Sequence, residues 1–191
     1  MVRSTLIVSV LAFSLTGFVA AQGEKPATEV KPPPGVEPAM PTPGPQHEHL
    51  KQAAGTWDAV VEMEGMPPSK GVSVMKITKN GFWLVDDFKG DFGGMAFEGQ
   101  GTTGYDPIKG KFVATWIDNM SPALMVMEGS FDEKTKTLNM TGDGYDMQGN
   151  KVKVRESILH QTSDLTVFQM FQTGADGKEA RLMKITYTRR K

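Results

Sequence analysis

A chain of 191 residues has room for one domain of about 100–150 residues with extensions. It has 21 Lys and Arg against 22 Asp and Glu, interspersed along the chain, so it lacks the basic stripe of a nucleic-acid-binding protein. It contains no cysteine, which excludes disulfides, thiolate metal sites, thiol nucleophiles and a lipid anchor on an N-terminal cysteine.

Residues 1–21 have the pattern of a signal peptide. Arg3 supplies a positive charge, residues 6–18 are apolar, and Val19-Ala20-Ala21 provide small side chains before a cleavage site at Gln22. The apolar run is shorter than the ~20 residues that a membrane-spanning helix needs. We therefore expect an exported protein, periplasmic or secreted, with no membrane span after cleavage. An uncleaved membrane anchor is the alternative.

Residues 22–46 are rich in proline and poor in large apolar side chains. Such a segment buries too little surface to offset its chain entropy, which predicts a disordered, extended linker. An export spacer is the favoured interpretation, and a proline-rich recognition motif is the alternative.

Residues 47–54 predict one or two helical turns that end at Gly55. His47, Glu48 and His49 resemble a metal motif, but residues two apart on a helix point about 200° from each other. We do not expect the two histidines to chelate a metal together.

From residue 55 onwards the chain repeats short runs with alternating apolar side chains, each closed by Gly, Asn, Asp or Pro. In residues 111–118, for example, Phe112, Ala114 and Trp116 occupy one face. We expect strands at residues 56–63, 71–77, 82–89, 95–105, 111–118, 123–131, 138–143, 152–160, 165–173 and 180–189. None of these runs has the 3.6-residue period of a helix, which excludes a βαβ fold.

About ten sequential antiparallel strands would expose two edges unless the sheet closes on itself. We therefore predict an all-β fold for residues 47–191: an antiparallel up-and-down β-barrel of about ten strands, preceded by a short helix. A barrel of this size is wide enough to enclose a cavity. Gly99, Gly101 and Gly104 lie within one predicted strand and are expected to mark bulges or tight bends.

Gly55-Thr56-Trp57 and the C-terminal Arg189 and Arg190 resemble the calycin arrangement. In that superfamily the Trp of a G-x-W motif closes one barrel end, and a basic side chain from the last strand packs across its indole. The resemblance implies a lipocalin-like barrel. Strand parity favours Arg189, and a guanidinium stacked on Trp gains cation–π attraction.

Further motifs, at residues 104–106, 115–119, 174–179 and 185–189, resemble an exported bacterial family of unknown function with a lipocalin-like barrel. This resemblance covers residue 46 to the C-terminus and implies a fold but no activity. There is also a distant similarity to nitrobindin-like barrels, which bind haem through a His of a late strand. Residues 180–189 contain no His, and His160 ends an earlier strand, so we do not expect a haem site.

The candidate ligand-binding residues are those expected to face the cavity: Trp57, Met63, Tyr105, Trp116, Asp118, Met127, Glu156, Tyr187 and Arg189. Asp118 could orient a polar group of a ligand, but it also fits the start of a turn, where its carboxylate would bond the backbone. The turn is the favoured interpretation. Glu156 shares a face with apolar residues, where an unpaired carboxylate is costly, so we expect a partner such as Arg189 or Tyr105.

Methionines are abundant, and Met125 and Met127 share a strand face that Met63 could approach across the barrel. Thioethers bind Cu(I), but methionine is also a pliant filler of apolar interiors, which is the favoured interpretation. We find no Ser, His and Asp spaced as in a catalytic triad, no glycine-rich phosphate-binding loop, and no pair of histidines spaced to bind a metal.

We therefore expect a non-enzymatic protein, without catalytic residues, metal or cofactor, that binds a small apolar or amphipathic molecule. The alternatives are a metal or haem protein of the cell envelope and a structural or interaction module. The sequence does not identify protein partners.

Overall fold

The computed structural model describes residues 40–146, 149–174 and 176–191. The predicted signal peptide and most of the predicted linker lie outside these residues. Pro41–Lys191 form one compact unit, which therefore begins six residues before the predicted domain start at His47. Within the described part of the chain, no helix has the length and apolar character that crossing a membrane would require.

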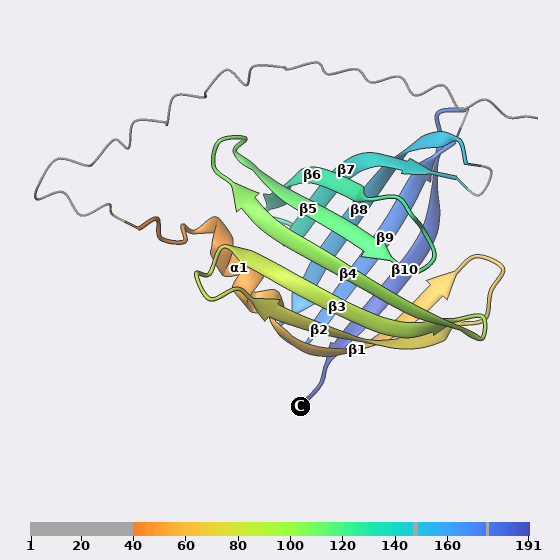
Figure 1. Cartoon of the computed structure of the whole chain (residues 1–191), viewed down its shortest axis with the longest axis horizontal. Helices are drawn as coiled ribbons and strands as arrows, with labels where there is room; N and C mark the ends of the chain where they lie inside the picture. The colour runs from red at the N-terminus through yellow and green to blue at the C-terminus, as the bar shows by residue number, and fades with distance from the viewer. Residues whose placement is uncertain (1–39, 147–148, 175) are drawn as a thin grey trace, which may run out of the picture. The chain divides into compact units, whose positions relative to one another are not determined.

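One helix is followed by ten strands (Figure 1). The elements are α1 (Gln46–Ala53), β1 (Gly55–Met63), β2 (Ser69–Ile77), β3 (Trp83–Phe92), β4 (Met95–Asp106), β5 (Lys111–Asp118), β6 (Met125–Asp132), β7 (Thr137–Tyr145), β8 (Lys151–Thr162), β9 (Leu165–Thr173) and β10 (Glu179–Arg189). This confirms the predicted all-β fold with a short preceding helix.

The sheet is a closed barrel in which each strand pairs antiparallel with its sequence neighbours and β1 pairs with β10. In the closing pair, Trp57 lies opposite Arg189, and Ala59 lies opposite Tyr187. Because Trp57, Ala59 and Val61 are buried, this register identifies the inner face of every other strand. Closure leaves no sheet edge for pairing with another chain.

The hairpin between β3 and β4 is tighter than its sequence indicates. Phe92 lies opposite Met95, so the turn consists of Gly93 and Gly94, with φ angles of 62° and 88°. A two-residue turn requires this left-handed backbone, which glycine adopts without steric cost. β3 therefore continues past Lys89, because Gly90 is an ordinary strand residue.

The prediction that the glycines of β4 mark bulges is wrong. The pairing of β4 with β3 and β5 has no register shift. Register shifts occur instead between His160 and Thr162 and in the last strand. A Cβ at Gly99 would overlap the ring of Trp116, so this glycine provides the space in which the indole lies against β4.

The buried side chains form two separate clusters. The first lies beneath α1 and consists of Leu50, Leu84, Phe112, Met127, Leu138, Met140 and Val154. The second consists of Trp57, Ala59, Val61, Phe88, Ile185 and Tyr187. Partly buried Met75 packs against both. On β3, Asp86 lies between Leu84 of the first cluster and Phe88 of the second, so the interior is divided where this carboxyl group lies.

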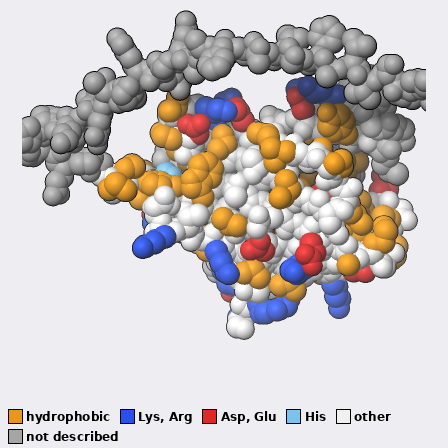
Figure 2. Space-filling view, viewed as in Figure 1, with side chains coloured by type: hydrophobic (Ala, Val, Ile, Leu, Met, Phe, Trp, Pro, Cys, Tyr) orange, Lys and Arg blue, Asp and Glu red, His pale blue; other side chains and the backbone are white. Residues whose placement is uncertain are grey.

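The outer face carries most of the charge, and Figure 2 shows acidic and basic side chains scattered among hydrophobic ones. On β8, Arg155 points outward, stacks on Phe171 at 4.0 Å from the ring centroid and binds both carboxyl oxygens of Glu179. Its neighbour Glu156 therefore points inward.

Candidate functional site

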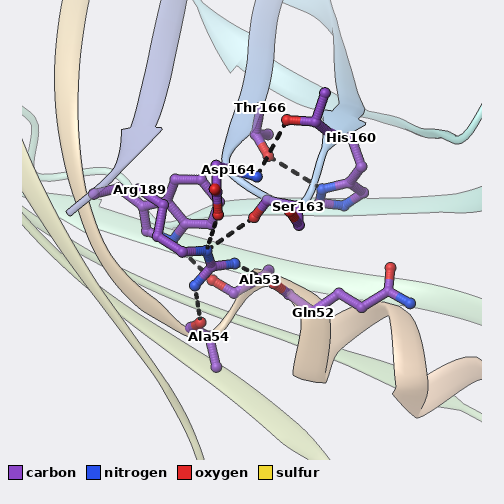
Figure 3. A network of polar contacts seen from close by, with 10 residues as sticks. Gln52, Ala53, Ala54, His160, Ser163, Asp164, Thr166 and Arg189 are labelled. Carbon is purple, nitrogen blue, oxygen red and sulfur yellow. Dashed lines mark hydrogen bonds and ion pairs between the residues drawn. The ribbon is translucent and has the colours of Figure 1, made fainter. Parts of the chain in front are cut away.

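Trp57 and Arg189 fasten the α1 end of the barrel. The guanidinium carbon of Arg189 lies 4.1 Å from the centroid of the Trp57 ring. Its N–H groups donate to the carbonyls of Gln52 (2.7 Å), Ala54 (2.7 Å) and Ser163 (2.8 Å), as Figure 3 shows. We call this arrangement the latch. Arg189, and not Arg190, fills the role, as strand parity predicts.

The latch also supplies hydrogen-bond donors to the free backbone carbonyls at the end of α1. The last carbonyls of a helix have no intrahelical partner and attract positive charge. Gln52 and Ala54 accept hydrogen bonds from Arg189, and Ala53 accepts one from the indole N–H of Trp57 at 2.9 Å. The helix is therefore held against the barrel by the same two side chains that close it.

Gly55 makes the latch sterically possible. Its φ is 144°, and a Cβ at this position would overlap Nη1 of Arg189. The glycine of the G-x-W motif therefore lets the guanidinium approach the backbone. Arg190 instead binds the exposed carboxylate of Asp58.

A partly open pocket of about 620 Å³ lies at the same end. The helix contacts β2, β3 and β4, and the pocket lies on the side that α1 leaves uncovered. We call it the mouth pocket. It is lined by His49, Gln52, Trp57, Phe131, Lys136, His160, Thr162, Ser163, Thr166 and Arg189.

Two histidines with different surroundings line the mouth pocket. His49 stacks on Phe131 with ring centroids 3.8 Å apart and lies 3.0 Å from a carboxyl oxygen of Glu133. Nδ1 of His160 lies 3.2 Å from Oγ1 of Thr166. Burial, and then charge on His49, lowers the pKa of His160, so this imidazole is neutral near pH 7. The pocket thus offers aromatic surface with a neutral imidazole.

Deeper in the barrel, Asp86 and Glu156 face inward from strands in different walls. Oγ of Ser73 donates to Asp86 at 2.5 Å. Glu156 lies between Met140 and Met170 in the register and forms no hydrogen bond or ion pair with any residue that the structure describes.

These carboxyl groups have unusual acidities. Burial raises the pKa of Glu156 to about 7. Burial also raises the pKa of Asp86 to about 6, although the hydrogen bond from Ser73 opposes the shift. The pKa of Tyr187 is raised well above its usual range by burial and then by the charges of Asp86 and Glu156. Tyr187 therefore lies within electrostatic reach of both carboxylates.

The interior around these groups is not fully packed. Among the described residues, every fully buried side-chain nitrogen or oxygen has a hydrogen-bond partner. The Glu156 carboxyl and the Tyr187 hydroxyl have no such partner, so their oxygens must still border space that water can enter. We call the region bounded by Asp86, Glu156 and Tyr187 the interior site.

The predicted ligand-binding residues are distributed over several places. Trp57 and Arg189 line the mouth pocket, whereas Glu156 and Tyr187 border the interior site. The expected partnership of Glu156 with Arg189 or Tyr105 is wrong, because Arg189 is bound to backbone carbonyls. Tyr105 packs edge-on against a neighbouring ring beneath α1.

Trp116 and Asp118 lie towards the opposite end of the barrel. One carboxyl oxygen of Asp118 accepts the backbone amides of Met120 and Ser121, each at 2.8 Å. The other accepts the indole N–H of Trp116 at 3.1 Å. The turn therefore occupies one oxygen of Asp118, as predicted, and the indole of Trp116 occupies the other.

Of the three methionines considered for Cu(I), Met63 lies apart from Met125 and Met127. Met127 is 1% exposed and Met125 packs against its cluster, whereas Met63 is 36% exposed and belongs to neither cluster. No group of three His, Asp or Glu residues in the described ranges could hold a metal ion. His47 lies against Phe82, away from the mouth-pocket residue His49.

Asp86 and the two histidines of the mouth pocket are not among the ligand-binding residues predicted from the sequence. The sequence pattern could have predicted an inward-facing Asp86, because it shares a strand face with Leu84 and Phe88, just as Glu156 shares one with its apolar neighbours. His49, Lys136 and His160 come from a helix, a turn and a strand end, and only barrel closure brings them together.

The fold and the latch define a closed, ten-stranded, lipocalin-like antiparallel barrel. The chain belongs to the DUF1579 family, described as a protein of unknown function, which it matches over residues 42–189. No curated protein matches the sequence.

Among solved structures, the S-type phycobiliprotein lyase CPES from Guillardia theta is similar with a TM-score of 0.50 and 12% identity, over 76% of this chain and 93% of that chain. A redesigned β-barrel, mFAP1 bound to DFHBI, has a TM-score of 0.40 and 15% identity, over 74% of this chain and 98% of that chain. At these identities the likeness concerns the fold alone.

Proposed function

We propose that this barrel binds and carries a small apolar or amphipathic molecule without transforming it. The observation that carries the proposal is the interior site, where an unpartnered carboxyl group borders accessible space between two apolar clusters. Apolar walls with a few polar groups are the usual design of small-molecule sites, because the walls supply affinity and the polar groups fix orientation.

The mouth pocket is the proposed entrance. Thr166 lines this pocket and lies opposite Tyr187 in the sheet, while His160 lies on the same inner face of β8 as Glu156. The two sites are therefore connected by short stretches of the same strands. A ligand would enter beside α1, where the mouth pocket is partly open.

Binding is favoured over catalysis by the state of the interior groups. The raised pKa of Tyr187 keeps its phenol protonated, which makes it a poor nucleophile or base. Ser73 is 0% exposed, so its hydroxyl oxygen is not accessible to a substrate.

The test uses purified full-length protein in two measurements. Native mass spectrometry after gentle purification should detect a retained small molecule, and Nile red, a neutral apolar dye, should gain fluorescence on uptake. Met75 bridges the two clusters, so Met75→Trp should fill the space and reduce uptake. Val74→Trp, next along β2 on the outer face, is the matched control. Folded protein that retains no molecule and takes up no dye would overturn the proposal.

We also propose that the protein acts outside the cytoplasm, on the basis of residues 1–21. The intact mass of protein isolated from its native host should correspond to a chain beginning at Gln22. A full-length mass in the cytoplasmic fraction would contradict this.

A further inference from the structure

The inner face of the barrel is acidic and lacks a free cation. In the described strands its charged or titratable side chains are Tyr105, Asp118, His160, Tyr187 and Arg189, besides Asp86 and Glu156, and no lysine faces inward. β7 and β9, which flank Glu156, present no titratable group to the interior.

Arg189 and Asp118, which lie towards the two ends of the barrel, already have hydrogen-bond partners. Arg189 donates to three backbone carbonyls, and Asp118 accepts from a turn and from Trp116. Asp86 and Glu156 therefore face the interior without a compensating positive charge. A buried carboxylate lacking a cation or donor is unfavourable, so the site is complementary to a ligand that brings one.

We infer that the interior site takes a protonated organic amine with an apolar body, held by Glu156 and assisted by Asp86. This inference rests on the proposed function and specifies its ligand class. The ammonium would donate to the unpartnered Glu156 carboxylate, and the apolar body would lie between the two hydrophobic clusters. An anionic amphiphile would meet two carboxylates, and a neutral one would leave them unpaired.

Three probes of equal chain length separate these classes: decylamine, decanol and decanoate, each below its micellar concentration. Isothermal titration calorimetry near pH 8 should give decylamine the highest affinity, about tenfold or more above decanol, because a charge-assisted hydrogen bond contributes more than a neutral one. The preference should decrease near pH 5, where Glu156 and Asp86 are protonated. Decylamine itself stays charged at both pH values.

Glu156→Gln preserves the shape and removes the charge, so it should abolish most of the decylamine preference and its pH dependence, while decanol affinity stays the same or rises because no ionised Glu156 is left unpaired. Asp86→Asn should have a smaller effect in the same direction. Glu62→Gln, at an outer-face carboxylate paired with Lys184 at 2.7 Å, should change nothing. Circular dichroism checks that each variant is folded.

Equal or tighter binding of decanol or decanoate near pH 8 would overturn the amine assignment and leave the carrier function standing. An unchanged decylamine preference in folded Glu156→Gln would also overturn it. Failure of all three probes, together with no uptake of Nile red, would overturn both the assignment and the carrier function.

Discussion

Trp57 and Arg189 come from the first and last strands of the barrel, yet they are direct register partners and stack at 4.1 Å. The latch therefore acts between the two strands whose pairing closes the sheet. It links closure of the barrel to the docking of α1, because the same guanidinium binds the last carbonyls of the helix.

Replacing Arg189 by Lys should lower the free energy of unfolding by about 2 kcal/mol, because an ammonium cannot stack on the indole and reach three carbonyls together. Urea denaturation followed by tryptophan fluorescence measures the change. Arg190→Lys, in the neighbouring exposed pair with Asp58, serves as the control and should have little effect. Equal effects of the two substitutions would contradict this role for the latch.

Glu156→Gln should change how stability depends on pH. In the folded protein the pKa of Glu156 is about 7, whereas the ordinary value is 4.5. Its contribution to stability is therefore full below about pH 4.5 and is lost as the pH rises through about 7. From about pH 4 to pH 8, Glu156→Gln should gain up to about 3 kcal/mol of unfolding free energy relative to the original chain.

Urea titrations at both pH values give this difference. Glu179→Gln provides a control of opposite sign, because the hydrogen bond from Arg155 lowers the pKa of Glu179. The stability due to Glu179 is present above its ordinary pKa and is lost as the pH falls. A Glu156→Gln effect that does not vary with pH would show that the carboxyl group is fully hydrated.

Gly99→Ala should destabilise the barrel by about 1–3 kcal/mol, because the new methyl group would displace the Trp116 ring. The near-ultraviolet circular dichroism of the indole should change as well. In a Trp116→Phe background the smaller ring makes room, so the same substitution should cost less. If the losses of unfolding free energy from the two single substitutions simply add in the double variant, steric contact is ruled out as the cause.

Asp118→Ala should lower stability by about 1 kcal/mol, because the amides of Met120 and Ser121 would lose their acceptor. Asp118→Asn retains a carbonyl oxygen and should recover most of the loss. Binding of the amine probe should be unaffected in both variants. A large loss of binding with unchanged stability would instead favour a ligand-contacting Asp118.

The alternation of apolar residues and the turn residues predict the strands and their closure well, because both depend on local chemistry and on the need to remove sheet edges. The alternation of side chains along the last strand also correctly predicts that Arg189, and not Arg190, is the partner of Trp57. Local patterns do not predict the place of Glu156 relative to Asp86 and Tyr187, since those positions depend on the register across the whole barrel. They also place Tyr105 and Trp116 in one cavity, whereas the structure puts them towards opposite ends of the barrel.

The pairing of β1 with β10 means that no strand of this barrel is topologically terminal. A circular permutant that joins the original ends through a flexible linker and opens the chain between Gly93 and Gly94 would interrupt only a turn. Every strand pair would be retained, but closure would then join β3 to β4, so the order in which the barrel assembles could be altered without changing its architecture.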